Sequence, residues 1–338
     1  MIGRIASTAC SADTGGNEMK SRRGLAIGLA AAAVLTVGGC STDGPAGNRG
    51  DGGARTLGIV QFSGDDVYSN SALNGAAKYA ESQGWKTITV DAKGSVDGAN
   101  AAMENLITRG VDALLVSVFP SSALSSGAAS AAEAQIPVAN WGGGLGNGVK
   151  FAADTALGDE IARRVVEDMM GHGDLLALGY RPGLPCQNRE AALDKVLAGT
   201  EVKVTKQQIT IPGAATSASE ATLGWLASHQ PQGQPIAVWA CFDDPATGVA
   251  SALRQAGRND VLSYGLNGTA PALELVRKGE LTATLWIDGP AQGQDLAKLL
   301  MQHLKDPTSV KSQVIGGTTK VIDRSNVESF LAEHPELR

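Results

Sequence analysis

Aromatic rings and hydrogen-bonding side chains occur together where apolar runs of the sequence give way to helical patterns. Asp66 and Tyr68 follow the first such run, and Trp141 closes the fourth. A tyrosine ring can lie flat on the C–H face of a small molecule while a nearby carboxylate accepts hydrogen bonds from its hydroxyl groups. This pairing indicates noncovalent binding of a hydroxylated ligand. A second interpretation of Asp66 is a helix cap, because aspartate is among the residues preferred at helix N-termini.

Motifs for catalysis are missing from the sequence. It has no Gly-x-Ser-x-Gly elbow, no P-loop and no His-Glu-x-x-His pair. The glycine-rich loop at 142–148 departs from Gly-x-Gly-x-x-Gly, because Val149 stands at the last glycine position. The histidines fall near predicted helix ends or in loops: His172, His229, His303 and His334. We therefore expect no enzymatic activity, no cofactor and no metal site, and keep an exported hydrolase as a remaining hypothesis.

Composition limits the class of protein further. Of 338 residues, 43% are hydrophobic and 18% are charged, which provides enough apolar material for a core and excludes a disordered chain. The formal charge of −6 argues against a nucleic-acid partner, which requires a basic face. The length suggests about two domains.

Residues 19–40 have the pattern of an export signal. Basic residues precede an apolar run at 25–37, which is shorter than the roughly 20 residues of a membrane-spanning helix. The run ends in small residues and Cys40, and so resembles the lipobox of bacterial lipoproteins, in which the cysteine is acylated and becomes the first mature residue. The other interpretation is an ordinary signal peptide in which the cysteine is incidental.

The lipobox resemblance divides the N-terminal part of the chain. We expect residues 1–39 to be removed as a signal peptide, with translation starting at Met19. Residues 40–55 are polar and rich in glycine, and are expected to form a lipidated, flexible tether. A diacylated cysteine suits this role, because one acyl chain alone holds a protein to a bilayer only marginally. The mature protein would be anchored on the outer face of the cell membrane.

From Thr56 onward, short apolar runs alternate with helical patterns. The predicted strands are 56–62, 86–91, 113–118, 136–140, 175–178, 202–209, 236–241, 261–264 and 282–286. The predicted helices are 69–83, 99–109, 121–135, 190–197, 219–228, 246–255, 271–278 and 292–304. Such alternation predicts an α/β protein built from right-handed βαβ units, here repeated in two halves. In open parallel sheets of this kind, ligands bind beyond the carboxyl ends of the strands.

Four segments resemble the ribose-type sugar-binding proteins of ABC importers: 56–85, 136–141, 237–253 and 263–285. The resemblance is most specific between Gly265 and Gly279. It implies the type I periplasmic binding fold, in which two Rossmann-like lobes with parallel sheets are joined by a three-strand hinge. The same fold occurs in sugar-responsive repressors, but those carry a helix-turn-helix where this chain has an export signal.

The resemblance also implies domain boundaries. The chain is expected to cross between lobes near Ala153–Thr155, Ile287–Gly289 and Ile315–Lys320. The expected N-terminal lobe is 56–153 with part of 288–315, the C-terminal lobe is 154–286, and 315–338 forms the hinge return and the C-terminal segment.

Residues at the strand ends are carried over from the family as ligand-binding candidates. They are Asp66, Tyr68, Trp141, Gln187, Phe242, Asp243, Asn267, Trp286 and Asp288. Besides Asp66, three of them have a structural alternative. Trp141 could be buried beneath its loop, Asp243 could cap a helix starting at Pro245, and Asp288 could serve the hinge. For Asp243 the cap is the favoured interpretation.

Several positions depart from the ribose-type pattern. Gly142 and Gly143 stand where the family has an Asp-Arg pair. Gln187 stands at the position of a second arginine, with Arg189 two residues further on, and Asn267 replaces an aspartate. Because both charged positions have changed, the sequence does not identify the ligand; the ligand class expected from the resemblance is a small neutral sugar or polyol.

The function implied by the resemblance is that of a monomeric solute-binding lipoprotein. The ligand would bridge the two lobes, favour the closed form, and be delivered to the permease subunits of an ABC importer. The alternative is a receptor that signals to a membrane sensor kinase, because a kinase could recognise the same closed shape.

Cysteine usage predicts one disulfide. Cys10 precedes the expected start and Cys40 is expected to be lipidated, which leaves Cys186 and Cys241 in an oxidising compartment. In the strand order 2-1-3-4-5 expected of this fold, the first and third strands of the second lobe are neighbours. Their carboxyl ends should therefore approach the Cα separation of about 5.5–6 Å that a disulfide requires. Two buried, unpaired thiols are the alternative.

Overall fold

The structure is a computed structural model that describes residues 53–154, 157–230 and 233–338. These residues form two sheets of mostly parallel strands, flanked by helices. The expected signal peptide at 1–39 and Cys40 lie outside these residues. Within the described ranges, no helix is long and apolar enough to cross a membrane.

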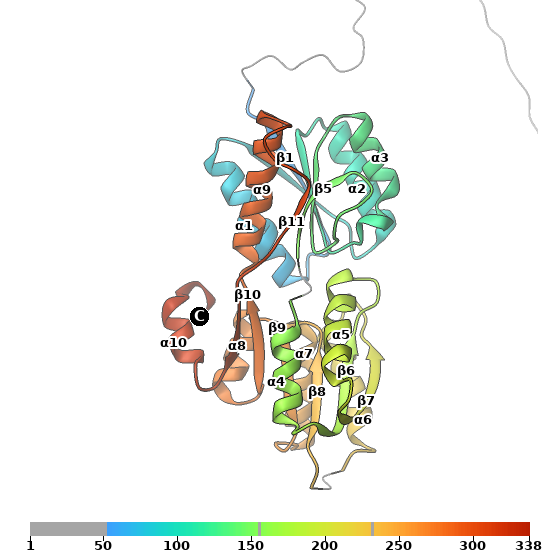
Figure 1. Cartoon of the computed structure of the whole chain (residues 1–338), viewed down its shortest axis with the longest axis vertical. Coiled ribbons are helices and arrows are strands. Elements are labelled where there is room, and N and C mark those ends of the chain that lie inside the picture. The colour runs from blue at the N-terminus through green and yellow to red at the C-terminus, as the bar shows by residue number, and fades with distance from the viewer. Residues whose placement is uncertain (1–52, 155–156, 231–232) are drawn as a thin grey trace, which may run out of the picture. The chain divides into compact units, whose positions relative to one another are not determined.

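The first sheet is entirely parallel and has the order β11-β5-β4-β3-β1-β2. Its strands are β1 (Thr56–Gln61), β2 (Lys86–Asp91), β3 (Ala113–Ser117), β4 (Val138–Trp141), β5 (Val149–Ala153) and β11 (Gln313–Ile315). The central strand β3 is buried along its whole length, as expected of a parallel strand covered by helices on both faces. Figure 1 shows α1 (Val67–Ser82) and α9 (Gly289–Lys305) on one side of this sheet, and α2 (Val96–Thr108) and α3 (Ser125–Glu133) on the other.

The second sheet has the equivalent order β12-β10-β9-β8-β6-β7, with only the edge strand β12 antiparallel. Its strands are β6 (His172–Gly179), β7 (Glu201–Gln208), β8 (Ile236–Ala240), β9 (Leu262–Asn267), β10 (Ala283–Ile287) and β12 (Thr319–Asp323). Its helices are α4 (Asp159–Asp168), α5 (Leu184–Leu197), α6 (Ala214–Leu226), α7 (Asp243–Ala256), α8 (Ala270–Lys278) and α10 (Val327–Glu333). The predicted α/β class and the predicted 2-1-3-4-5 order are confirmed in both sheets.

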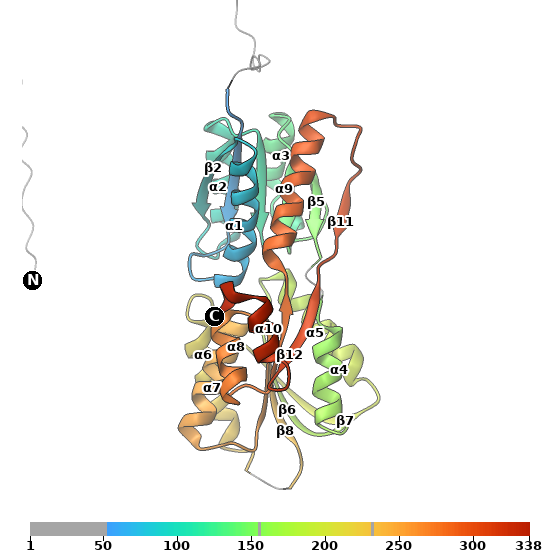
Figure 2. The ribbon, with the colours of Figure 1, turned by 90° about the vertical axis from the view of Figure 1, so that its left-hand side faces the viewer.

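The chain passes between the two sheets at three places. Two of them, from β10 to α9 and from β11 to β12, can be followed in Figures 1 and 2. We call these the crossing segments: the stretch that follows β5 and begins at Asp154, the single residue Asp288, and residues 316–318. Helix α9 follows the second crossing and packs closely on α1 of the first lobe. A Cβ at Gly293 of α9 would lie 1.8 Å from the carbonyl oxygen of Ala72, so only glycine permits this approach.

Some elements differ from the sequence-based expectation. The strands β5, β11 and β12 and the helices α4 and α10 were not predicted, and α5 begins at Leu184 rather than at Glu190. The expected helix 121–135 is instead a 3₁₀ turn at Ser121–Ala123 followed by the shorter helix α3. The later start of α3 leaves the residues after β3 as a loop near the strand ends.

Candidate functional site

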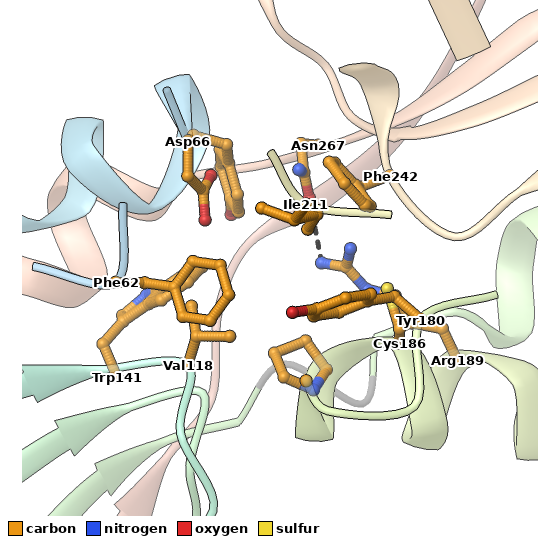
Figure 3. Close-up of a pocket in the computed structure, with 13 residues that line it drawn as sticks. Phe62, Asp66, Val118, Trp141, Tyr180, Cys186, Arg189, Ile211, Phe242 and Asn267 are labelled. Atoms are coloured by element: carbon orange, nitrogen blue, oxygen red, sulfur yellow. Dashed lines mark hydrogen bonds between the residues drawn. The ribbon is translucent and has the colours of Figure 1, made fainter. Parts of the chain in front are cut away.

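A pocket lies where the carboxyl ends of the two sets of strands face each other (Figure 3). It encloses about 400 Å³ of space free of protein atoms, part of it open to solvent. From the first lobe it is lined by Phe62, Asp66, Tyr68, Val118 and Trp141. From the second lobe it is lined by Tyr180, Gly183, Pro185, Cys186, Arg189, Ile211, Phe242 and Asn267. Both lobes therefore contribute to one site, at the place where the fold predicts ligand binding.

Two aromatic rings of the first lobe form part of the wall and are also part of the core. Tyr68 and Trp141 are 7% and 2% exposed, and their ring centroids lie 5.2 Å apart in an edge-to-face arrangement. The Tyr68 hydroxyl donates to the carbonyl oxygen of Ile287 at 3.3 Å, and Trp141 Nε1 donates to Gln292 Oε1 at 3.0 Å. Burial raises the pKa of Tyr68 far above its usual value, so this hydroxyl stays a donor. The two alternatives for Trp141 are therefore not exclusive, because the ring is both buried and on the wall.

Asp66 is both a helix cap and a residue of the pocket wall. It is the N-cap of α1, and its Oδ1 accepts a hydrogen bond from the Ser69 N–H at 3.1 Å. In Figure 3 its carboxylate also points toward the pocket, opposite Arg189. Burial raises the pKa of Asp66, while its hydrogen bonds to Ser69 and the charge of Arg189 oppose that shift.

Arg189 is a charged site residue that the sequence analysis did not select. It is 2% exposed, lines the pocket, and donates to the carbonyl oxygen of Cys241 at 2.8 Å and to Asn267 Oδ1 at 2.9 Å. Burial lowers the pKa of its guanidinium, while the surrounding carboxylates raise it. The arginine assumed to be lost is therefore present on the second-lobe wall.

Gln187, which was expected at this position, is exposed and lies outside the pocket. Its Nε2 donates to the carbonyl oxygen of Arg181 at 2.7 Å. The physical reason is helical phase. Both residues lie on α5, and two residues apart on a helix with 3.6 residues per turn point about 200° apart. Because α5 begins at Leu184, earlier than predicted, both residues lie within the helix, and Arg189 is the one that faces inward.

Asn267 and Phe242 line the pocket as the sequence analysis placed them. Asn267 ends β9 and is 4% exposed, and its φ of 124° lies in a region that side chains rarely adopt. Its Oδ1 accepts from Arg189, so the two polar groups of this wall hold each other in position.

Asp243 does not line the pocket and does not cap the helix in which it lies. That helix, α7, begins at Asp243 itself, and the preceding N-cap residue is Phe242. The fully buried carboxylate instead accepts from Thr269 N–H at 2.7 Å, from Thr269 Oγ1 at 3.0 Å and from Thr284 Oγ1 at 2.7 Å. Because Thr269 is the N-cap of α8, Asp243 stabilises the start of that helix, and the predicted cap at Pro245 is wrong.

Trp286 and Asp288 also lie outside the pocket lining. The Trp286 ring packs on Phe330 and His334, with centroids 5.2 and 4.8 Å away, in the C-terminal segment. Asp288 is the N-cap of α9, where its Oδ1 accepts from Ala291 N–H at 3.0 Å. Its backbone N–H donates to the carbonyl oxygen of Thr318 in the third crossing segment. These contacts agree with the alternative interpretation, in which Asp288 serves the hinge.

The predicted disulfide between Cys186 and Cys241 is present, with Cα atoms 5.3 Å apart. It joins the first turn of α5 to the residue that follows β8, and β8 pairs directly with β6. Cys186 lies on the pocket wall beside Arg189 and Phe242 (Figure 3).

Further lining residues had no signal in the sequence analysis. Phe62 and Tyr180 face each other across the pocket with centroids 6.2 Å apart, edge to face. Val118 and Ile211 add further apolar surface to the pocket wall. Over the described residues, no group of three or more His, Cys, Asp or Glu side chains could hold a metal ion. The pocket is thus lined mostly by aromatic and apolar side chains, with a few polar groups, and is suited to noncovalent binding.

Comparison with known proteins agrees with this geometry. A sequence profile of the periplasmic binding protein domain matches residues 58–308. The chain belongs to this family. The ribose import binding protein of Bacillus subtilis is 28% identical over 245 residues, covering 70% of this chain and 78% of that protein. The xylitol-binding protein of Mycolicibacterium smegmatis is 25% identical over 272 residues, covering 79% and 77%.

Solved structures show the same fold. An ABC transporter solute-binding protein from Agrobacterium vitis with bound allitol superposes with a TM-score of 0.75 at 21% identity, covering 83% of this chain and 99% of that one. The relatives of this periplasmic binding protein are sugar- and polyol-binding components of ABC importers rather than enzymes. The chain is accordingly an extracytoplasmic solute-binding protein of this type.

Proposed function

We propose that this periplasmic binding protein captures one small sugar or polyol between its lobes and delivers it, as a monomer, to the permease of an ABC importer. The observation that carries the proposal is the pocket itself. Five aromatic rings surround it, and the paired side chains of Arg189 and Asn267 face Asp66 across it. The ligands named for the relatives, ribose, xylitol and allitol, carry the hydroxyl groups and C–H surfaces that such side chains bind.

The pairing of rings and polar groups suits a sugar. Apolar C–H faces can pack on Phe62, Tyr68 and Phe242, while hydroxyl groups donate to the Asp66 carboxylate and accept from Arg189. A ligand that touches both walls makes all of these contacts only when the lobes are together, so binding favours the closed form.

We also propose that Cys40 carries the lipid that anchors the protein to the outer face of the membrane. The support is the lipobox-like pattern at 37–40 after a short apolar run. The apolar run is too short to span a bilayer by itself. The polar stretch from 41 to 55 would leave the folded lobes free to meet a permease.

A thermal-shift screen of the mature chain against pentoses, hexoses, inositols and linear polyols tests the ligand class. At a hundredfold excess over Kd, a true ligand adds about 2.7 kcal/mol to the free energy of unfolding. The melting temperature should then rise by roughly 5–10 °C.

Two variants connect such a shift to the proposed site. Arg189→Lys should weaken binding at least about tenfold, because lysine cannot reproduce the planar fork that bonds Asn267 and the carbonyl oxygen of Cys241. Gln187→Ala, on the outer face of the same helix, should leave Kd unchanged. A chain that responds to no member of the panel, or a Gln187 variant that binds more weakly than Arg189→Lys, would refute the proposal.

A further inference from the structure

One buried side chain, Gln292 in the first turn of α9, connects the pocket wall to the crossing segments. It is 2% exposed and lies outside the pocket lining. Its Oε1 accepts from the indole Nε1 of Trp141 at 3.0 Å. Its Nε2 donates to the carbonyl oxygen of Asp154 at 3.0 Å and to that of Gly316 at 3.3 Å. The side-chain amide of Gln292 thus forms hydrogen bonds both with the Trp141 ring of the pocket wall and with the backbone of two crossing segments.

The second ring of the same wall contacts the remaining crossing. The Tyr68 hydroxyl donates to the carbonyl oxygen of Ile287, the residue just before Asp288. A Cβ at Gly289 would lie 2.9 Å from the Tyr68 ring, so the backbone there passes directly over it. The edge-to-face contact of the two rings, with centroids 5.2 Å apart, joins these connections into one network.

The backbone around Gln292 leaves little room for another arrangement. A Cβ at Gly317 would lie 2.5 Å from Gln292 Nε2. Asp154 and Gly316 flank the pair β5–β11, whose last paired residues are Ala153 and Ile315. The amide therefore bridges two chain segments at the point where both leave the first sheet. Because buried polar groups that lose a partner are costly, a shift of either segment is coupled to the position of the Trp141 ring.

We propose that Gln292 is a positioning residue that couples ligand contact at Trp141 to the segments on which lobe closure depends. The inference rests on the proposed function, since it requires a ligand in the pocket. Contact with the indole ring stabilises one position of its N–H, and that position fixes the amide bonded to Asp154 and Gly316. Loss of the network should lower affinity even though Gln292 itself does not touch the ligand.

A double-mutant cycle separates this coupling from ordinary packing. Trp141→Phe keeps an aromatic ring in the wall and removes the indole N–H together with part of the ring surface. Gln292→Met keeps the side-chain length and removes both the acceptor and the donor. Gln292→Glu keeps an acceptor for Trp141 and removes the donor to Asp154 and Gly316. The matched control is Gln302→Leu, an exposed glutamine on the same helix.

Two quantities are measured for each protein with the tightest sugar or polyol of the panel: Kd by calorimetry, and the ligand-induced decrease in radius of gyration by X-ray scattering. We expect each Gln292 variant to raise Kd by about tenfold or more and to reduce the change in radius of gyration. The double variant Trp141→Phe with Gln292→Met should bind no more weakly than the weaker single variant, because both changes remove the same bond. Gln302→Leu should match the unmodified protein.

The outcomes separate this inference from the proposed function. If the unmodified protein binds no sugar or polyol, the proposed function fails and the coupling with it. If it binds, but Gln292→Met and Gln292→Glu keep both Kd and the change in radius of gyration, the coupling is refuted alone. Additive effects of Trp141→Phe and Gln292→Met on binding would also refute it. Should Gln292→Met fail to fold, Gln292→Glu and Trp141→Phe decide by the same two measurements.

Discussion

Removal of the Cys186–Cys241 disulfide should destabilise the second lobe by an amount that its loop length sets. The bond spans a sequence separation of 55 residues. In the chain-entropy treatment, a closed loop of that size contributes about 4 kcal/mol at 25 °C by restricting the unfolded chain. At roughly 2–4 °C per kcal/mol, the double variant Cys186→Ala with Cys241→Ala should melt about 8–16 °C below the unmodified protein. Scanning calorimetry of both proteins measures this difference.

The controls rely on the chemistry of the bond. Reductant should lower the melting temperature of the unmodified protein toward that of the double variant, and should leave the double variant unchanged. In a Cys40→Ser background, thiol titration after unfolding without reductant should find no free cysteine. Two free thiols, or a double variant that melts within about 2 °C of its parent, would show that the bond does not stabilise the protein in solution.

Two further predictions concern a carboxyl group near the pocket and the membrane anchor. Burial, together with the negative charges of Asp66, Asp243 and Asp65, raises the pKa of Asp244 to about 7. Between about pH 4 and 7 the folded state then holds a proton that the unfolded state lacks, so stability should fall as pH rises, by up to about 1.4 kcal/mol per pH unit. Asp244→Asn should flatten this part of a urea-unfolding profile, and an unchanged slope would contradict the assigned cause. Cys40→Ser should move the protein from the membrane to the soluble fraction of cells, whereas unchanged fractionation would exclude lipidation at this residue.

The alternating strands and helices could be predicted because each depends on a local pattern of apolar and polar residues. Apolar runs separated by helical periodicity identified the parallel strands up to β10 except β5, and the fold implied by the family resemblance gave the order of both sheets. From that order the neighbouring ends of β6 and β8 followed, and with them the pairing of Cys186 with Cys241. β11 was missed because it has only three residues, and β5 and β12 were missed because each follows another strand without an intervening helix.

Side-chain direction was the main limit at the site. Asp66, Tyr68, Trp141, Phe242 and Asn267 all line the pocket, because each lies at the carboxyl end of a parallel strand or in the segment that follows one. Within a helix, a shift of two residues reverses the direction, which is why alignment to Gln187 missed Arg189. The prediction that Trp286 lines the site was wrong for the corresponding reason in a strand, because successive side chains of a strand point to opposite faces of the sheet. The Trp286 ring packs on Phe330 instead.

The two apparent losses of charge have different consequences for recognition. The glycines after β4 are a real loss, because Gly142 has a φ of 85° and a Cβ at Gly143 would lie 2.0 Å from the carbonyl oxygen of Phe119. No side chain beyond Trp141 can enter the site from this turn, so Asp66 is the one charged group that lines the pocket from the described part of the first lobe. On the opposite wall Arg189 keeps its charge, with Asn267 holding its orientation. In the proposed function, discrimination among hydroxyl patterns therefore depends chiefly on the second lobe, while the first lobe supplies mainly ring surface and a single carboxylate.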